Sequence, residues 1–225
     1  MSNIRMVVFD MAGTTVDEDN IVYKTLQKAI NEAGFDISLN QVLAEGAGKE
    51  KLQAIKSILS VYADNHDMEL ANGIFKAFLI KLAKAYEINP VYPQPHAAEL
   101  FEELKKRNIL VVLNTGYDRA TAQSLIEKLG WQEGTHFDGL ITATDVSKNR
   151  PDPDMIELAM KRFNITAPSS VVKVGDSIID IEEGRNAHCG LSIGITTGAH
   201  TPEQLASAHP DNVINDLMEL LPLVN

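Results

Sequence analysis

Near the start of the chain, a short apolar run ends in an aspartate and a loop-forming segment, Met6-Val-Val-Phe-Asp10-Met-Ala12-Gly-Thr-Thr15. A continuous apolar run predicts a buried strand, so the aspartate lies at its carboxyl end. The glycine and the threonines that follow can wrap an anion with backbone N–H groups and hydroxyls. An ionised aspartate in such a place is a candidate nucleophile.

Further polar groups stand at or near other predicted strand ends: Asn114-Thr115-Gly116, Lys148 with Arg150, and Gly175-Asp176-Ser177 with Asp180 one helical turn later. The carboxyl ends of parallel strands meet at one edge of a sheet, so these groups are expected to converge on Asp10. Together they offer a carboxylate nucleophile, donors for anionic oxygens, a cation and carboxylates for a hard metal ion. This set suits phosphoryl transfer.

The elements that must position these groups follow a strand–helix alternation. Continuous apolar runs predict strands at 4–9, 109–113, 140–142, 171–174 and 191–195. Helical stripes lie between them, and Thr201-Pro-Glu-Gln204 is a helix-start signature. We therefore expect an α/β fold with a doubly wound, Rossmann-like parallel sheet.

The segment from Val16 to Tyr86 differs, because no convincing strand pattern occurs in it. Three helical stripes are found instead, the first ending at Gly34: Tyr23, Leu26, Ile30 and Ala33; Leu52, Ile55, Leu59 and Tyr62; Ile74, Phe78, Leu82 and Ala85. We expect a small helical domain at 16–89, inserted after the first strand of a core formed by 1–15 and 90–225.

Composition limits the partners. The 225 residues carry a net charge of −11 without any basic block, so nucleic acid and anionic membranes are not expected as partners. No apolar stretch reaches membrane-spanning length. The single cysteine, Cys189, and the lack of a signal-peptide pattern predict a cytoplasmic location.

These motifs, in this order, resemble those of the haloacid dehalogenase-like hydrolases over essentially the whole chain. The resemblance implies that Asp10 is the nucleophile, that Thr115 and Arg150 are catalytic, and that Gly175-Asp-Ser-Ile-Ile-Asp180 completes the site. Lys148 is the alternative to Arg150. It further implies Mg²⁺ held by Asp10, the Ala12 carbonyl and Asp176 with Asp180 close by, and a helical cap formed by the insert.

The same resemblance suggests a substrate-binding loop built from Ala12, Gly13, Thr14 and Gly116. Ala12 stands where most phosphatases of this superfamily carry an aspartate that protonates the leaving group. Alanine there resembles the phosphonoacetaldehyde hydrolase branch, which cleaves a C–P bond through a cap lysine that forms a Schiff base. Lys49, in Glu45-Gly-Ala-Gly-Lys49, is the candidate lysine, and Lys51 is the alternative.

The preferred hypothesis is a Mg²⁺-dependent, phosphonatase-like hydrolase that acts on a small phosphate or phosphonate metabolite through phospho-Asp10. Phosphonoacetaldehyde hydrolysis using Lys49 is the first alternative. The second is a non-catalytic module that binds metal and phosphate without turnover, which Ala12 favours. Substrate identity and oligomeric state are left open, a homodimer being one option.

Overall fold

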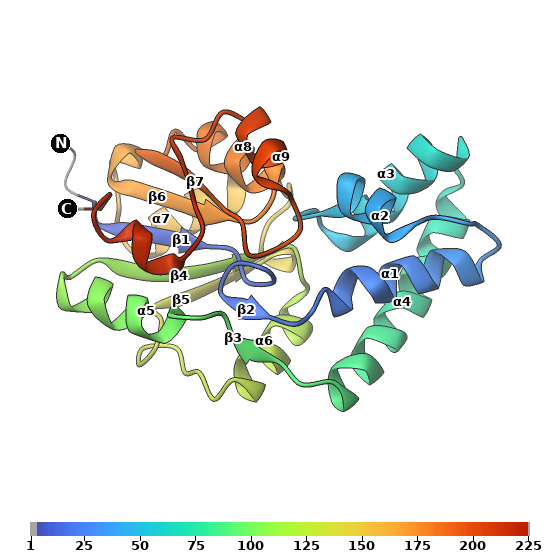
Figure 1. Cartoon of the computed structure of the whole chain (residues 1–225), viewed down its shortest axis with the longest axis horizontal. Coiled ribbons are helices and arrows are strands. Elements are labelled where there is room, and N and C mark those ends of the chain that lie inside the picture. Colours follow the sequence, from blue (N-terminus) through green and yellow to red (C-terminus); the bar gives the residue numbers. More distant parts are fainter. Residues whose placement is uncertain (1–3, 225) are drawn as a thin grey trace.

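A computed structural model describes residues 4–224, and six parallel strands form its central sheet in the order β5-β4-β1-β6-β7-β8 (Figure 1). The strands are β1 (Met6–Phe9), β4 (Leu110–Thr115), β5 (Gly139–Thr142), β6 (Val171–Gly175), β7 (Leu191–Ile195) and β8 (Asn212–Ile214). All five predicted strands are present. β8, which has only three residues, is an edge strand that the sequence did not reveal.

Both faces of the sheet are buried, which explains the continuous apolar runs. In β1, Val7 and Phe9 face a core that includes Leu100 and Phe101, whereas Met6 and Val8 face a second core with Met155 and Ile156. The helices and 3-10 turns of this domain are α5 (Ala97–Lys106), α6 (Arg119–Lys128), η1 (Ala143–Asp145), α7 (Asp154–Arg162), η2 (Pro168–Ser170), α8 (Ile178–Asn186), α9 (Pro202–Ser207) and η3 (Leu217–Leu220). The doubly wound α/β prediction is confirmed.

Four helices form the insert: α1 (Ile21–Glu32), α2 (Leu39–Gly46), α3 (Lys51–Ala63) and α4 (Met68–Ile88). The three predicted stripes correspond to α1, α3 and α4, and their apolar side chains pack in one core, except Ala33, which follows α1 and is exposed. The short helix α2 begins at a capping box of Ser38 and Gln41. In Figure 1 the insert lies beyond the carboxyl ends of the sheet strands, next to the predicted site.

Two strands of two residues each join the insert to the sheet domain. In this pair β2 (Val16–Asp17) runs antiparallel to β3 (Tyr92–Pro93), so the outgoing and returning linkers are hydrogen-bonded neighbours. The expectation that no strand occurs between Val16 and Tyr86 was therefore wrong for β2. Two residues are too few for an alternating or apolar pattern to register.

Within residues 4–224, no helix combines the length and the hydropathy needed to cross a membrane.

Candidate active site

Asp10 lies at the carboxyl end of β1 and is almost fully buried. Its backbone N–H donates to Val174 O at 2.9 Å, which fixes it between β1 and β6. The following turn needs Gly13, whose φ is +86° and whose position would bring any Cβ into collision with the Asp176 carboxylate. The Thr15 hydroxyl donates to Asp10 O at 2.9 Å and closes the loop.

Three buried carboxylates converge here, because Asp10, Asp176 and Asp180 each place an oxygen within 4.8 Å of the others. Burial, reinforced by the negative charges of Asp10 and Asp180, raises the pKa of Asp176 well above its ordinary value. The Thr14 hydroxyl donates to Asp176 at 3.3 Å, and the backbone N–H of Ala199 donates to it at 2.6 Å. The predicted carboxylate cluster thus forms from β1, the β6–α8 loop and α8.

Arg150 is the cation of this cluster that pairs with Asp10, and its side chain is only 1% exposed. Its Nη1 lies 2.7 Å from Asp10 and 2.9 Å from Asp180. The same nitrogen donates to Gly48 O of the insert at 3.3 Å, so the guanidinium also bridges the two domains. The alternative cation, Lys148, is exposed and lies 4.0 Å from Asp152.

Thr115 and Gly116 stand at the end of β4, where the insert approaches the sheet domain most closely. The Thr115 hydroxyl accepts a hydrogen bond from Tyr117 N at 3.2 Å, which leaves its own proton able to donate toward the site. A Cβ on Gly116 would lie 2.7 Å from the Lys49 carbonyl and 3.0 Å from that of Gly48. Only glycine allows this approach.

The two candidate lysines have different surroundings. Lys49 Nζ lies 3.3 Å from a Glu45 carboxylate oxygen and donates to the Ser57 hydroxyl at 3.1 Å, so its charge is satisfied within the insert. Lys51 is buried, and its Nζ donates to Lys49 O at 2.7 Å. Burial lowers the pKa of Lys51 to about 8, against the opposing attraction of Asp10.

Aromatic rings enclose the Lys51 ammonium. It lies 5.4 Å from the ring centroid of Tyr23 and 5.3 Å from that of Tyr117, distances that allow cation–π attraction. Lys51 and Tyr117 also line a cavity of about 280 Å³ between the insert and the sheet domain. Its other walls include Gly116, Phe78 and Leu82.

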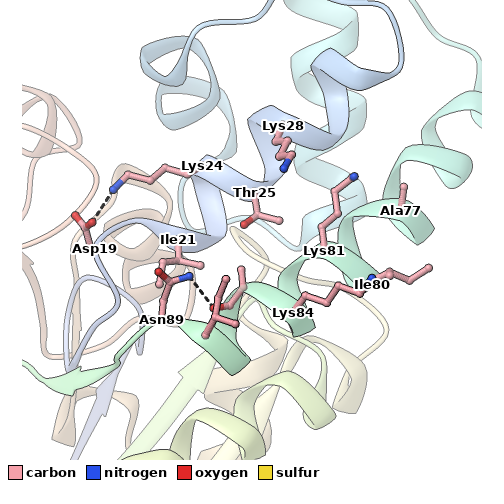
Figure 2. A pocket seen from close by; sticks show the side chains of 12 residues that line it. Asp19, Ile21, Lys24, Thr25, Lys28, Ala77, Ile80, Lys81, Lys84 and Asn89 are labelled. Atoms are coloured by element: carbon pink, nitrogen blue, oxygen red, sulfur yellow. Dashed lines mark hydrogen bonds and ion pairs between the residues drawn. The ribbon is translucent and has the colours of Figure 1, made fainter.

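A larger hollow of about 730 Å³ lies between α1 and α4, away from the carboxylates (Figure 2). Four lysines line it: Lys24, Lys28, Lys81 and Lys84. Lys24 pairs with Asp19 at 2.8 Å, and Lys81 contacts Glu32. None of the catalytic candidates lines this hollow, so we place the site at the smaller, buried cavity and the carboxylates.

The sequence of residues 7–193 matches the family of haloacid dehalogenase-like hydrolases. The chain is 30% identical to a phosphonoacetaldehyde hydrolase of Latilactobacillus sakei, over 87% of this chain and 76% of that protein. It is 24% identical to pyrophosphatase PpaX of Oceanobacillus iheyensis, over 99% and 97% of the two chains. Its fold resembles the crystal structure of a hydrolase from Pseudomonas syringae, with a TM-score of 0.86, 21% identity and coverage of 97% and 96%.

The chain belongs to the haloacid dehalogenase-like hydrolases. It is therefore a hydrolase of phosphatase or phosphonatase type, as its motifs indicated.

The family implies Mg²⁺, and the residues present fit it. Asp10, Asp176 and Asp180 supply oxygen donors only, the donor type that Mg²⁺ prefers. Burial is the larger cause of the raised Asp176 pKa, and the repulsion from Asp10 and Asp180 that adds to it is the kind of charge excess that a divalent cation relieves. Asp180 is partly neutralised already: burial opposes its ionisation, but Arg150 and Lys173 outweigh burial and hold its pKa below the ordinary value.

Two buried charged residues in this hydrolase escaped the sequence analysis. Lys173, in the middle of β6, lies 2.9 Å from Asp180 and 3.3 Å from Glu183. Glu183 of α8 in turn lies 3.0 Å from Arg150 Nε and accepts from the Asn114 amide at 2.9 Å. A lysine that interrupts the apolar run 171–174 was the available signal, because a buried charge is costly unless it is paired.

A second missed group is a hydrogen-bonded set of three side chains, of which Tyr117 lines the Lys51 cavity. Glu18 accepts a hydrogen bond from the Tyr86 hydroxyl at 3.1 Å, and the Tyr86 and Tyr117 hydroxyls lie 2.8 Å apart. All three residues are buried. No motif links a linker glutamate, a tyrosine at the end of α4 and a tyrosine after β4, so sequence spacing alone could not find them.

Proposed function

We propose that this protein is a Mg²⁺-dependent, phosphonatase-like hydrolase that acts on a small phosphate or phosphonate metabolite through a phospho-Asp10 intermediate. The observation that carries the proposal is the convergence of Asp10, Arg150 and Asp176, all buried, at one edge of the sheet. The proposed domains are a core of 1–15 and 90–225 and a helical cap of 16–89.

In the proposed first step, an Asp10 carboxylate oxygen attacks phosphorus, the P–O or P–C bond to the leaving group breaks with its electron pair going to the leaving group, and an acyl phosphate forms. Burial raises the pKa of Asp10, and Arg150 opposes that rise through its 2.7 Å ion pair, which favours the ionised nucleophile. Asp10 and Asp176, with Asp180 close by, would hold Mg²⁺, which would supply positive charge that offsets the repulsion between nucleophile and phosphate. The Thr115 hydroxyl, the Gly116 N–H and the backbone of the Ala12-Gly13-Thr14 turn are assigned to those oxygens.

In the second step, water hydrolyses phospho-Asp10 and releases phosphate.

Ala12 has no ionisable group, so the proton that a poor leaving group needs in the first step must come from the substrate or from the cap. A phosphate ester with a good leaving group needs no such proton. The lack of a proton donor at Ala12 therefore favours two kinds of substrate: activated phosphate esters, and phosphonates whose leaving carbanion is stabilised.

Phosphonoacetaldehyde hydrolysis is the second candidate, and the setting of Lys51 favours it. An imine-forming lysine must be neutral to attack an aldehyde, and a pKa of about 8 leaves a usable neutral fraction at neutral pH. We therefore assign the Schiff-base role to Lys51, the alternative lysine, rather than to Lys49. The ion pair with Glu45 holds the Lys49 ammonium within the insert.

The cavity of about 280 Å³ beside Lys51 sets the size of the group that the phosphorus carries. It accommodates a leaving group of a few heavy atoms and is lined largely by apolar side chains of α3 and α4, among them Leu52, Phe75 and Leu79. This supports a small metabolite rather than a polymer or a phosphoprotein as the substrate.

The test is phosphate release from 4-nitrophenyl phosphate with Mg²⁺, followed by phosphonoacetaldehyde with and without borohydride. Release that is lost in Asp10→Asn supports the hydrolase and eliminates the non-catalytic binding module. A borohydride-stable adduct on Lys51 would assign C–P cleavage. If neither substrate yields phosphate while Mg²⁺ still binds, the binding module is correct instead.

A further inference from the structure

Glu18 is a buried acid that the proposed mechanism leaves unused. It lies in the linker between β2 and α1, with only 3% of its surface exposed. Its carboxylate accepts from Val22 N at 2.9 Å and from the Tyr86 hydroxyl at 3.1 Å. Among residues 4–224, no lysine or arginine forms an ion pair with it. A buried carboxyl without a cation is costly, which calls for a reason beyond packing.

Hydrogen bonds connect Glu18 to the sheet domain. Tyr86 stands near the end of α4, and its hydroxyl lies 2.8 Å from that of Tyr117, in the loop after β4. Glu18 belongs to the outgoing linker, Tyr86 to the insert and Tyr117 to the sheet domain. The three side chains thus connect the linker, the insert and the sheet domain by hydrogen bonds.

Tyr117, the last residue of this hydrogen-bonded chain, contacts Lys51 through its ring. The Lys51 ammonium lies 5.3 Å from the Tyr117 ring centroid, and both residues line the same cavity. The other ring near the Lys51 ammonium, that of Tyr23, is held in place because its hydroxyl accepts a hydrogen bond from Gly48 N at 3.0 Å. Holding Tyr117 in place therefore holds one side of the Lys51 ammonium.

Electrostatic attraction also connects Lys51 with Glu18. The charges facing Lys51 are Asp10, Glu50 and Glu18, which favour the ammonium, and Arg150, which opposes it. Lys51 and Lys24 are the cations that act on Glu18, and its other titratable neighbours are the tyrosines Tyr23, Tyr86 and Tyr117.

Burial raises the pKa of Glu18 to about 7 and lowers that of Lys51 to about 8, so the two groups titrate in adjacent ranges. Burial raises the pKa of all three tyrosines well above the ordinary value. They consequently stay protonated in this range and act only as hydrogen-bonding groups.

The direction of the hydroxyl chain follows from the charge on Glu18. An ionised Glu18 can only accept, so Tyr86 donates to it and accepts from Tyr117. A protonated Glu18 can donate to Tyr86 instead, and Tyr86 is then free to donate to Tyr117. The protonation of Glu18 therefore changes both the charge felt by Lys51 and the hydrogen bond that orients Tyr117.

We propose that Glu18 is a positioning residue which, acting through Tyr86 and Tyr117, sets the charge state and the placement of Lys51. This inference rests on the proposed function in one respect, the assignment of Lys51 to the active site. Glu18 lies outside the sequence motifs described above. Through it, the protonation state of Lys51 would be controlled in a site that has alanine at position 12.

The decisive experiment is an NMR titration of Lys51 in the full-length protein labelled with ε-¹³C-lysine, with the Lys51 signal assigned by its loss in Lys51→Met. In Glu18→Gln the negative charge is removed at constant shape, so the Lys51 pKa should fall by roughly 0.3 to 1 unit. Tyr86→Phe removes a hydrogen bond that favours ionised Glu18, so it should give a smaller fall. Glu32→Gln and Tyr62→Phe, on the insert but away from this chain, are the matched controls and should give none.

An unchanged Lys51 pKa in Glu18→Gln, or an unchanged one in Tyr86→Phe, overturns the proposal. Circular dichroism of each variant checks that the comparison is between folded proteins. The titration uses neither substrate nor Mg²⁺, so its outcome is separate from that of the hydrolase assay. If borohydride trapping succeeds, Tyr86→Phe should also lower kcat roughly ten-fold with KM nearly unchanged, because phosphate contacts stay intact.

Discussion

Arg150 Nη1 lies 2.7 Å from Asp10 Oδ1 in a place where both side chains are buried. The same guanidinium contacts Asp180, Glu183 and the backbone of the insert, so one residue pairs with the proposed nucleophile and links the two domains. The relationship connects stability to chemistry, because any change at Arg150 alters both. The effect of the Arg150 charge can be tested separately from the effect of its hydrogen-bond geometry, by comparing methionine with lysine at this position.

Arg150→Met should destabilise the fold by about 3–5 kcal/mol, because it leaves buried carboxylates without their cation. Arg150→Lys keeps the charge but loses the forked contacts to Asn114 and Glu183, so it should fold yet lose roughly ten-fold or more in kcat. Urea denaturation and phosphate release measure the two effects. Arg162→Lys, on an exposed pair with Glu133, is the control.

Asp10→Asn should abolish phosphate release, with a loss of roughly 10³-fold or more, because an amide cannot form the acyl phosphate. The exposed neighbour Asp17, changed to asparagine, should keep its activity. Mass spectrometry of protein quenched in acid should detect a phosphorylated Asp10 peptide in the wild type and in Asp17→Asn, but not in Asp10→Asn. Equal turnover in both variants would mean that the nucleophile lies elsewhere.

Mg²⁺ should raise the stability of the wild-type protein by about 2.7 kcal/mol at 100 times its dissociation constant. Asp176→Asn should lose this response, since it removes one ligand. Without Mg²⁺ the same variant should be more stable than the wild type, because it no longer buries a carboxylate that Asp10 and Asp180 repel. Thermal melts with Mg²⁺ and with EDTA test both signs, and a retained Mg²⁺ response would contradict the assigned cluster.

Lys51→Met should eliminate borohydride trapping by phosphonoacetaldehyde and stabilise the fold at pH 7. The Lys51 pKa is lowered to about 8, so burying the ammonium costs up to about 3 kcal/mol below pH 8, and the cost fades as pH rises toward 10.5. Lys49→Met removes a partly exposed pair and should change stability by less than about 1 kcal/mol. Trapping that persists in Lys51→Met and disappears in Lys49→Met would restore Lys49 to the role.

Glu18→Gln should have a pH-dependent effect on stability. The folded-state pKa of Glu18 is raised to about 7 from 4.5, so the wild type loses stability as pH rises from about 4.5 through 7. The variant lacks this loss, and its advantage over the wild type should grow by up to about 3 kcal/mol between pH 4.5 and pH 8. Urea denaturation at these two values measures the difference, and a constant difference would show that Glu18 does not titrate in this range.

Several parts of the site were predictable because local sequence controls them. The apolar runs before Asp10, Thr115 and Asp176 are buried strands of one parallel sheet, and such a sheet brings its carboxyl ends to one edge. Gly13 and Gly116 were singled out, and each lies where a Cβ would collide with its surroundings. The helices of the insert followed from stripes that their buried faces require.

Lys49 and Lys51 mark the limit of that reasoning. Lys49 precedes α3 and Lys51 is its first residue, and the sequence pattern favoured Lys49, with Lys51 as the alternative. Only packing against Tyr23 and Tyr117 decides which ammonium becomes buried, and that ammonium belongs to Lys51. The same holds for Glu18, Tyr86 and Tyr117, which come from three separate segments.

The sequence by itself determined the fold class, the strand-end position of Asp10 and the absence of an acid at Ala12, since each depends on residue type and short-range pattern. The tertiary structure alone decided the partners of Arg150 and the burial of Lys173 and Lys51. These depend on contacts between residues as many as 140 positions apart, as Arg150 and Asp10 are. Their energies come from burial and charge in the assembled interior, which no local pattern encodes.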